Sequence, residues 1–370
     1  MINVVMISTD AKILEEGSSV RARMQDYGKL FSSLHIVLFV KKSTHAVTSL
    51  SENVTVYPTN STSKFFHIRD GKKIGEDIIS SRAFTAHDTI ITTQDPFEAG
   101  IVGLYLSETT GIKLHVQVHT DLGSIFFADG FLNKIRILFS KKTLRKAHAI
   151  RTVSARIKTS LSPKLQHKAS ILPIFADLAS IATAPITIDL AKKYPQFKKI
   201  ALIASRFTKE KDIYTALRAF NIVHKSYADS GLVIVGSGPL LPEIMTKVQG
   251  FKGAVILEDW ADQKTLISYM KTCDVFVSSS LYEGYGLSML EAHAAGALLV
   301  ATNAGIAPLL TSEECLVEPG DLHGLAEALK KAFSCLVRNK DYKYPYTSKQ
   351  AYLEAFKADI ERTLLYLSHE

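Results

Sequence analysis

Hydrophobic positions in this chain gather into short runs rich in β-branched residues, separated by longer stretches of mixed polarity. The first half contains the runs INVVMIS, LHIVLFV, DTIITTQD, KLHVQVHTD and AIRTVS. The second half repeats the rhythm with KIALIASRF, LVIVGSGP, AVILEDW, DVFVSSS and ALLVATN. Short apolar strands that alternate with helical stretches are typical of a parallel sheet covered by helices on both faces. The pattern therefore predicts an α/β protein.

The rhythm breaks at residues 176–197, where two prolines fall in a stretch without a clean period. A chain of 370 residues is also too long for one ordinary hydrophobic core. We therefore expect two Rossmann-like domains with doubly wound parallel sheets, residues 1–180 and 181–348, facing a central cleft. Residues 349–370 have apolar positions at helical spacing, and we expect this last helix to pack back on the first domain.

The stretch EGYGLSMLEAHAAG holds two glutamates around a glycine-punctuated turn that joins a buried strand to a helix. Free N–H groups at a helix N-terminus favour an anion, and Gly284 and Gly286 let the backbone approach it closely. Glu283 in the loop and Glu291 on the helix supply carboxylates that accept paired hydrogen bonds from vicinal hydroxyls. The turn thus predicts a phosphate bound beside a sugar. The alternative is structural, because Ser288 and Glu291 also match the S-x-x-E capping box.

Two cations follow the strand KIALIASRF, with Arg206 directly after it and Lys211 five residues later. Arginine can clamp a diphosphate in bidentate fashion, and lysine adds a point charge. The alternative is an exposed loop with ordinary surface charge, since Lys209 and Glu210 can pair with each other. No D-x-D pair and no Walker A sequence accompany these residues. We therefore expect no metal, and cationic side chains must neutralise any bound phosphate.

Three residues in the first half stand at comparable places beyond predicted strands. Gly17 and Ser18 lie between the first strand and a helix, which makes them a second candidate turn for an anion. His119 ends the strand KLHVQVHTD, where its ring can donate to a sugar hydroxyl or a phosphate. The alternative for His119 is a ring whose hydrogen bonds are satisfied within the protein. Ligands of open parallel sheets bind beyond the carboxyl ends of the strands, so these residues are candidates for the site.

The net charge of +8 is spread unevenly along the chain. Residues 1–200 hold 27 Lys and Arg against 16 Asp and Glu, whereas residues 201–370 hold 17 against 20. Between Asp129 and Asp177 there are 11 basic residues and no acid. Basic residues interleaved with Leu, Ile and Phe predict that residues 130–176 dock on an anionic membrane surface or a phosphorylated lipid acceptor. The alternative is a solvated basic helix, and the scarcity of aromatic residues there argues against a nucleic-acid partner.

The chain has no run of about 18 apolar residues that would predict a membrane span. Its first residues carry neither a basic flank nor the long apolar stretch of a signal peptide. Cys273, Cys315 and Cys335 show neither a disulfide framework nor metal-ligand spacing, which fits a reducing compartment. We therefore expect a cytoplasmic protein that residues 130–176 hold at the inner face of the membrane.

Taken in order, these motifs resemble the family-4, or group 1, glycosyltransferases of the GT-B fold. SRFTKEKD resembles the family's G-R-L-x-x-x-K-G, IVGSGP its G-x-G-P strand end, and EGYGLSMLEA its donor motif E-G-F-G-L-x-x-x-E-A. Gly17, with Ser18 beside it, matches half of the family's usual glycine pair. The chain departs from the family pattern at Ser205, which replaces the Gly before the arginine, and at Asp212, which replaces the last Gly of that motif.

The resemblance implies a role for each candidate residue. Arg206 and Lys211 would bind the donor diphosphate, and Glu291 would hold the ribose. His119 and Glu283 would act at the transferred sugar. The backbone of the donor turn would contact phosphate and sugar through Gly284, Tyr285, Gly286 and Leu287.

The resemblance also implies a retaining, metal-independent glycosyltransferase that needs no cofactor. It would move a hexose-type sugar from a UDP- or GDP-sugar to a glycan or a lipid-linked acceptor. The family has no agreed protein nucleophile, and the leaving diphosphate is thought to take the proton of the acceptor. Two alternatives with the same fold stay open. One is a nucleotide-sugar 2-epimerase, which would convert the donor without an acceptor, and the other is a catalytically silent relative that only binds the donor.

Overall fold

The structure is a computed structural model that describes three stretches of the chain, residues 1–41, 45–334 and 337–365. Cys335, one of the three cysteines, lies outside these described residues. Among the described residues, no helix combines the length and the apolar character needed to cross a bilayer.

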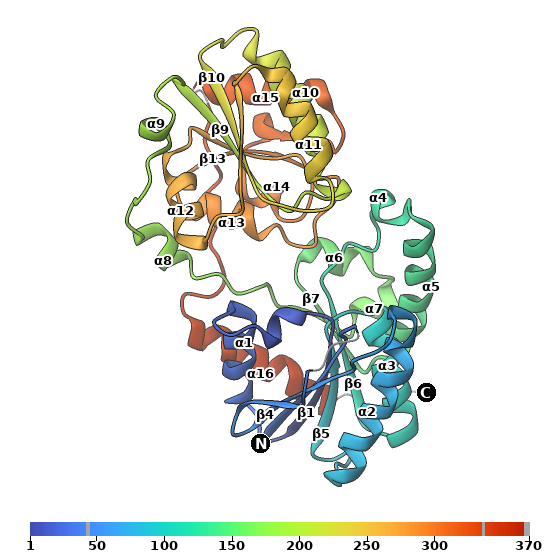
Figure 1. Ribbon diagram of the computed structural model, residues 1–370. Helices are drawn as coiled ribbons and strands as arrows, with labels where there is room; N and C mark the ends of the chain where they lie inside the picture. Colours follow the sequence, from blue (N-terminus) through green and yellow to red (C-terminus); the bar gives the residue numbers. More distant parts are fainter. Residues whose placement is uncertain (42–44, 335–336, 366–370) are drawn as a thin grey trace. The chain divides into compact units, whose positions relative to one another are not determined.

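The chain divides into two compact units (Figure 1). Unit 1 contains Met1–Pro173 together with Ser348–Glu370, and unit 2 contains Ile174–Thr347. The division thus falls after Pro173, whereas the sequence pattern placed it after residue 180.

Unit 1 is built on an eight-stranded sheet of described residues in the order β3-β4-β2-β1-β5-β6-β7-β8. Its strands are β1 Asn3–Ser8, β2 Ser33–Leu38, β3 Thr48–Ser51, β4 Val54–Pro58, β5 Thr89–Thr93, β6 Lys113–Val118, β7 Ala149–Thr152 and β8 Ala169–Ile171. All neighbouring pairs are parallel except β3 and β4 at one edge, which are antiparallel. The apolar runs predicted β1, β2, β5, β6 and β7. They did not predict β3, β4 and β8, which are short and mix polar with apolar residues.

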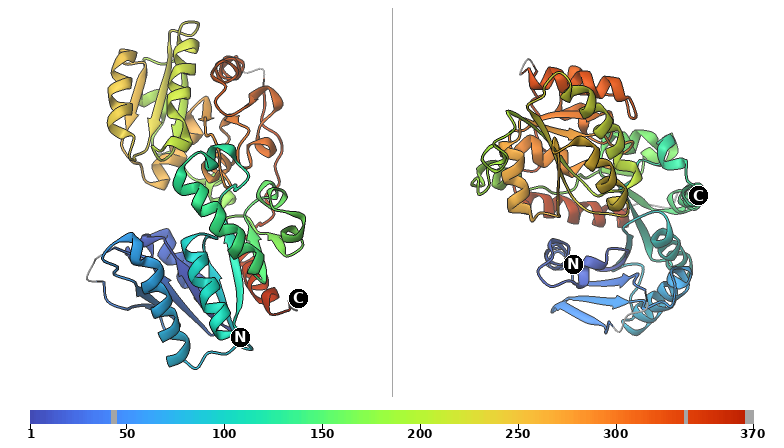
Figure 2. Two further views of the ribbon diagram at one scale, coloured as in Figure 1. Left: turned by 90° about the vertical axis from the view of Figure 1, so that its right-hand side faces the viewer. Right: turned by 45° about the horizontal axis from the view of Figure 1, so that its top comes forward.

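Helices cover both faces of this sheet, with α2, α3 and α5 on one side and α1 and α16 on the other (Figures 1 and 2). The helices of unit 1 are η1 Ala11–Leu14, α1 Ser19–Gly28, η2 Lys64–Phe66, α2 His67–Ser81, α3 Glu98–Thr110, α4 Ile125–Ala128, α5 Phe131–Lys146, α6 Ala155–Ser160, α7 Pro163–Gln166 and α16 Lys349–Leu365. The η elements are 3₁₀ helices. This layering is the doubly wound arrangement that the sequence predicted.

The C-terminal helix α16 is held in unit 1 by ring stacking and by a buried ion-pair network. Tyr27 stacks on Phe356 with ring centroids 3.9 Å apart. Asp359 accepts hydrogen bonds from His115 Nε2 at 3.0 Å and from Arg362 Nε at 2.8 Å. Burial opposes ionisation of Asp359, but His115 and Arg362 outweigh it and hold the pKa of this carboxyl well below its ordinary value. The helix is therefore part of the unit 1 core.

Unit 2 is built on a six-stranded parallel sheet of described residues in the order β11-β10-β9-β12-β13-β14. Its strands are β9 Lys199–Ala204, β10 Ser230–Val235, β11 Val255–Glu258, β12 Val275–Ser278, β13 Leu298–Thr302 and β14 Leu316–Val317. The apolar runs of the second half predicted the first five of these strands. They missed β14, which is two residues long.

Unit 2 also has helices on both faces, with α10, α11 and α15 on one side and α12 and α13 on the other (Figure 1). The helices of unit 2 are α8 Leu178–Thr183, α9 Leu190–Lys193, η3 Lys209–Lys211, α10 Ile213–His224, α11 Leu241–Val248, η4 Gln249–Phe251, α12 Gln263–Thr272, α13 Leu287–Ala294, α14 Ala307–Leu310, η5 Glu313–Cys315 and α15 Leu322–Phe333. Phe207 and Phe220 are fully buried in the core between β9, α10 and α15.

Candidate functional site

The strands β10, β9, β12 and β13 of unit 2 end at one edge of the sheet. Ala204, the last residue of β9, pairs with Val235, the last residue of β10, and Ser278 of β12 pairs with Ala301 of β13. Because all these strands are parallel, the loops that follow them start side by side. These loops carry the candidate donor-binding residues of the second half, and ligands of open α/β sheets bind at such an edge.

Lys211 and Glu283 lie in direct contact at this edge and form an ion pair. Their side chains are only 14% and 12% exposed. Ser280 Oγ donates to the same oxygen, Glu283 Oε1, at 2.7 Å, and Ser279 Oγ donates to the carbonyl oxygen of Lys211 at 2.9 Å. The sequence assigned Lys211 to a diphosphate and Glu283 to a sugar. In the structure the two groups neutralise each other.

Arg206 behaves differently from Lys211. Its guanidinium side chain is 70% exposed and its Nη2 lies 3.5 Å from Glu210 Oε1. An exposed pair of this kind contributes little to stability, typically below about 1 kcal/mol. Arg206 can therefore turn toward an anion at a small cost in free energy.

The donor turn leads into α13 without a side-chain cap. Gly286 is the N-cap residue and has a φ of +95°, in the left-handed region that favours glycine. Among the described residues, no side chain accepts a hydrogen bond at this cap, and Leu287 begins the helix. Ser288 therefore lies inside the first turn rather than at the cap, so the capping-box alternative for Glu291 is wrong. The first N–H groups of α13 remain available for an anion.

Glu291 is a half-buried carboxyl group on α13, one turn beyond the start of the helix. No group of the described chain donates a hydrogen bond to it, and burial alone raises its pKa to about 7. Buried carboxylates normally have hydrogen-bond partners, because removing the charge from water is costly. Glu291 therefore lacks donors that a ligand with hydroxyl groups would supply.

The loop after β13 fixes the position of the donor turn. Gly305 has a φ of +57°, and a Cβ atom at this residue would lie 2.3 Å from the carbonyl oxygen of Tyr285. Ile306 N donates to that carbonyl at 2.9 Å. Only glycine allows so close an approach, so Gly305 sets where Glu283 and Tyr285 lie. The Tyr285 side chain itself is 4% exposed, which leaves only its backbone for a ligand.

Asp212 occupies a position where the resembled family usually has glycine. Its φ of +42° is left-handed, a conformation that Asp tolerates better than most residues. Its carboxylate caps α10 by accepting from Thr215 N at 3.3 Å. Burial raises the pKa of Asp212. The substitution therefore keeps the local backbone shape and adds a helix cap.

The G-x-G pair after β10 supports the loop that carries Arg206. A Cβ atom on Gly236 would lie 2.0 Å from the carbonyl oxygen of Ser205, and one on Gly238 would lie 2.6 Å from the carbonyl oxygen of Phe207. Phe207 N also donates to the carbonyl oxygen of Ser237 at 2.8 Å. These glycines therefore allow two loops to pack together.

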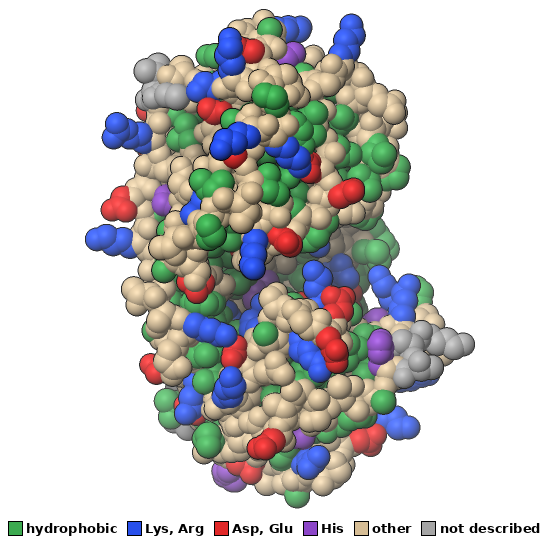
Figure 3. Space-filling view, turned by 60° about the vertical axis from the view of Figure 1, so that its left-hand side comes forward, with side chains coloured by type: hydrophobic (Ala, Val, Ile, Leu, Met, Phe, Trp, Pro, Cys, Tyr) green, Lys and Arg blue, Asp and Glu red, His purple; other side chains and the backbone are tan. Residues whose placement is uncertain are grey.

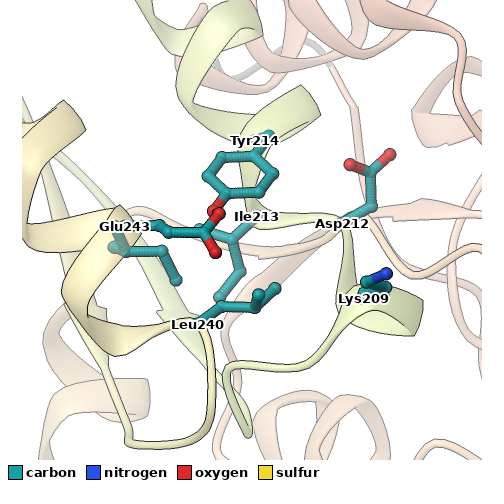
Figure 4. A pocket seen from close by; sticks show the side chains of 7 residues that line it. Lys209, Asp212, Ile213, Tyr214, Leu240 and Glu243 are labelled. Carbon is teal, nitrogen blue, oxygen red and sulfur yellow. The ribbon is translucent and has the colours of Figure 1, made fainter.

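A cavity of about 440 Å³ adjoins the loop after β9 (Figure 4). It is lined by Lys209, Asp212, Ile213, Tyr214, Leu240, Glu243 and Ile244. The Tyr214 hydroxyl donates to Glu243 Oε2 at 2.6 Å across this cavity wall. Arg206, Lys211 and Glu283 do not line it, so this cavity is separate from the donor-binding residues that the sequence predicted.

Gly17 and Ser18 lie in unit 1, between η1 and α1. Gly17 has a φ of +77°. Ser18 is the N-cap of α1: its Oγ accepts from Arg21 N at 3.1 Å and donates to the carbonyl oxygen of Lys12 at 2.5 Å. The Ser18 side chain is thus occupied by the helix cap, which leaves the backbone of this turn as the part that can bind an anion.

His119 follows β6 in unit 1 and is half-buried. Its Nε2 lies 3.2 Å from Gln117 Oε1, and Arg151 Nη1 donates to the same oxygen at 2.9 Å. Burial, with smaller effects of Arg151 and Arg23, lowers the pKa of His119 to about 3, so the ring is neutral at ordinary pH. The sequence analysis missed Gln117 and Arg151. The available signal was a polar and a charged residue inside two runs that otherwise read as buried strands.

The chain is similar in sequence to a known protein family and to individual glycosyltransferases. Residues 198–334 match the family model described as "Glycosyl transferases group 1". The alpha-monoglucosyldiacylglycerol synthase of Streptococcus pneumoniae is 26% identical over 225 residues, which cover 57% of this chain and 51% of that protein. The UDP-Gal:alpha-D-GlcNAc-diphosphoundecaprenol alpha-1,3-galactosyltransferase of Escherichia coli is 28% identical over 183 residues, covering 46% of this chain and 47% of that protein. The chain thus matches about half the length of these relatives.

Solved structures match over nearly the whole chain. The sucrose-phosphate synthase from Thermosynechococcus elongatus has a TM-score of 0.73 at 18% identity, and the match covers 99% of this chain and 94% of that one. Anabaena HepE, solved with UDP and glucose, has a TM-score of 0.67 at 14% identity, with 98% and 95% covered. At these identities the likeness concerns the fold alone, and the prediction of a GT-B fold is confirmed.

Proposed function

Because residues 198–334 match the model of the group 1 glycosyltransferases, we propose that the protein transfers a hexose-type sugar from a UDP- or GDP-sugar. The transfer retains the anomeric configuration and needs no metal. The acceptor is a glycan or a lipid-linked molecule. The observation that carries the proposal is the gathering of Lys211, Glu283, the uncapped start of α13 and the unpartnered Glu291 at one sheet edge.

Each of these groups fits one part of a nucleotide sugar. The exposed Arg206 and the ammonium of Lys211 neutralise the diphosphate, together with the N–H groups at the start of α13. Glu283, released from Lys211, accepts hydrogen bonds from hydroxyls of the sugar. Glu291 accepts hydrogen bonds from the vicinal hydroxyls of the ribose, which are the donors it lacks in the free protein.

The proposed reaction is a displacement at the anomeric carbon on the face that the diphosphate leaves. The bond from the anomeric carbon to the diphosphate oxygen breaks, the acceptor oxygen bonds to that carbon, and the acceptor proton passes to the departing diphosphate. The protein contributes positioning and charge stabilisation, which can together supply most of a rate enhancement. Arg206 and Lys211 stabilise the negative charge that develops on the leaving group. His119 is assigned to a hydroxyl of the substrate.

A thermal-shift panel of UDP, GDP and ADP with their sugars tests the donor assignment. A ligand present at about 100 times its dissociation constant stabilises the folded state by about 2.7 kcal/mol, which gives a clear shift. The matching sugar nucleotide, incubated with candidate glycans and lipids, should then give transfer product. Absence of any shift refutes donor binding. Conversion of the donor without acceptor indicates the epimerase, and binding without turnover indicates the silent relative.

We further propose that unit 1 docks on an anionic membrane through α5. This helix exposes four large apolar side chains: Phe131, Leu132, Leu138 and Phe139. It also exposes the basic residues Lys134, Lys141, Lys142 and Arg145. Positions 131, 134, 138, 142 and 145 recur at three- and four-residue spacing, which places them on one helix face. On the face of the molecule in Figure 3, by contrast, basic side chains are interspersed with acidic ones.

The printed names of the two relatives from Streptococcus pneumoniae and Escherichia coli contain a diacylglycerol and an undecaprenol, both lipids, which supports this membrane assignment. Each basic side chain near an anionic bilayer contributes about 1 kcal/mol. The double variant Lys134→Gln/Lys142→Gln should therefore bind phosphatidylglycerol vesicles more weakly by about 2 kcal/mol, roughly 30-fold. Lys225→Gln, an exposed lysine of unit 2, is the matched control. Absence of co-sedimentation of the unmodified protein at low salt refutes the docking proposal.

A further inference from the structure

Arg151 is a buried cation whose hydrogen-bond partners are all neutral oxygens. It lies on β7 and is 2% exposed. Its donors reach four acceptors: the Leu172 carbonyl at 3.1 Å, Gln117 Oε1 at 2.9 Å, the Pro173 carbonyl at 3.0 Å and the Tyr352 hydroxyl at 2.9 Å. Among the described residues, no carboxylate accepts a hydrogen bond directly from this guanidinium.

A buried charge in such surroundings is costly, and an apolar side chain of similar volume is often neutral or favourable in its place. Packing alone therefore gives no reason for an arginine at this position. The reason lies in the donors that only a guanidinium supplies, and one of them meets Gln117, the residue that also contacts His119.

The contact with Arg151 fixes the orientation of the Gln117 amide. Arginine can only donate hydrogen bonds, so the amide oxygen of Gln117, and not its nitrogen, faces the guanidinium. The same oxygen lies 3.2 Å from His119 Nε2. Since an oxygen acceptor requires a donor, the hydrogen of the neutral His119 ring must be on Nε2. The Nδ1 atom then carries a free lone pair.

The nitrogen of the Gln117 amide also has a hydrogen-bond partner, which favours the same orientation of the amide. Its nitrogen lies 3.3 Å from Thr92 Oγ1, and Thr92 Oγ1 lies 2.9 Å from His115 Nδ1. His115 Nε2 meets Asp359 Oδ2 at 3.0 Å. Because the ionised carboxylate can only accept, His115 carries its hydrogen on Nε2 and accepts from the Thr92 hydroxyl at Nδ1. In each hydrogen bond of the series from His119 to Asp359, the residue nearer to His119 is thus the donor.

We propose that Arg151 is a positioning residue for His119: through the Gln117 oxygen that both contact, it holds the His119 ring with its hydrogen on Nε2 and presents the Nδ1 lone pair as an acceptor for a substrate hydroxyl. The ligand assigned to His119 rests on the proposed function, whereas the tautomer does not. His119 therefore accepts from a substrate hydroxyl, in contrast to the donor role expected from the sequence. Arg151 and Arg23 of α1 are the charged groups that face this ring, and both disfavour its protonation.

The tautomer can be measured directly by two-bond ¹H–¹⁵N NMR of the full-length protein, with the His119 signals assigned from a His119→Asn sample. We expect the pattern of an Nε2–H ring that stays unchanged between about pH 5.5 and about pH 8.5. In Gln117→Leu the acceptor is gone, and the Nδ1–H form should appear. In Gln117→Glu the acceptor returns, and the Nε2–H pattern should return with it. An Nδ1–H ring in the unmodified protein, or the same spectrum in Gln117→Leu, overturns the proposal.

Kinetics supply the second readout. Outer partners that orient metal-bound histidines change activity by about 10- to 100-fold, and we expect kcat of Gln117→Leu to fall by about that factor. The KM for the nucleotide sugar should change less than about twofold, because its nucleotide is held in unit 2. A drop in melting temperature with unchanged kcat and tautomer would show a purely structural role and overturn the proposal. If no sugar is transferred but the tautomer responds as expected, the proposed function fails and the orientation of the His119 ring by the Gln117 oxygen stands.

Discussion

Replacing Glu291 with glutamine tests whether this carboxylate is kept for a ligand at the expense of stability. The side chain is half-buried on α13, and no described group donates a hydrogen bond to it. Burial raises its pKa from 4.5 to about 7. Glutamine has nearly the same size and cannot ionise, so Glu291→Gln removes the buried charge and leaves the packing intact.

The magnitude follows from proton linkage. The folded protein binds the Glu291 proton more tightly than the unfolded chain does, so ionisation lowers the free energy of unfolding as pH rises through about 7. A shift from 4.5 to about 7 corresponds to about 3 kcal/mol above pH 7. Glu291→Gln should therefore be more stable than the unmodified protein by about 3 kcal/mol at pH 8 and by less than about 1 kcal/mol at pH 5.

Ligand binding should change in the opposite sense. The carboxylate form accepts the ribose hydroxyls, so the affinity of the unmodified protein for a nucleotide sugar should rise about tenfold from pH 6 to pH 8. A sugar nucleotide is the suitable probe, because its diphosphate does not titrate in this range. In Glu291→Gln the affinity should be independent of pH. Glu291→Ala should lose about 1.5–3 kcal/mol of binding, the range for hydrogen bonds to a charged group.

Trp260, the single tryptophan of the chain, lies in unit 2 and reports the unfolding of this unit in urea. Binding can be followed by calorimetry on the same samples. Glu313→Gln is the matched control, because Glu313 is exposed in the same unit. Equal stability of Glu291→Gln and the unmodified protein at pH 8, together with equal affinity at both pH values, would refute the reasoning.

Four further substitutions test other parts of the structure. Arg206→Ala and Lys211→Ala should weaken UDP or GDP far more than the free nucleoside in calorimetry, because both cations are assigned to the diphosphate; equal losses for nucleotide and nucleoside would contradict this. Gly305→Ala should reduce nucleotide affinity at least tenfold, about 1.4 kcal/mol, by displacing the donor turn, whereas Gly253→Ala, also left-handed but with open space around it, should not. Asp359→Asn should destabilise unit 1 by about 3–5 kcal/mol in chemical denaturation, since it leaves His115 and Arg362 without their buried anion; a loss below about 1 kcal/mol would show that the Asp359 carboxylate contributes little to holding α16.

Much of the fold was predictable because buried parallel strands leave continuous apolar runs. Most of the strands were found in this way. The strands β3, β4, β8 and β14 were missed because short or half-polar strands resemble loops in sequence. The antiparallel pairing of β3 with β4 also left no signal, since pairing direction depends on the connection rather than on composition.

The residue types of the candidate site were predictable, but their pairing was not. Lys211 and Glu283 are 72 positions apart, and only the adjacency of β9 and β12 brings them into contact. The capping-box pattern was ambiguous because its outcome depended on where the helix begins, and Gly286 rather than Ser288 takes the cap. Gln117 and Arg151 were overlooked because their importance arises from one shared amide oxygen, which no spacing rule describes.

The contact between Lys211 and Glu283 has a consequence for which molecules can bind at this sheet edge. Inorganic phosphate or another simple anion can pair with the Lys211 ammonium, but the buried Glu283 carboxylate then keeps, among the described residues, only the Ser280 hydroxyl as a hydrogen-bond donor. A molecule that has both an anionic group and neighbouring hydroxyls can give Lys211 a new anion and Glu283 new hydrogen-bond donors. We therefore expect small anions alone to compete only weakly with a nucleotide sugar at this site.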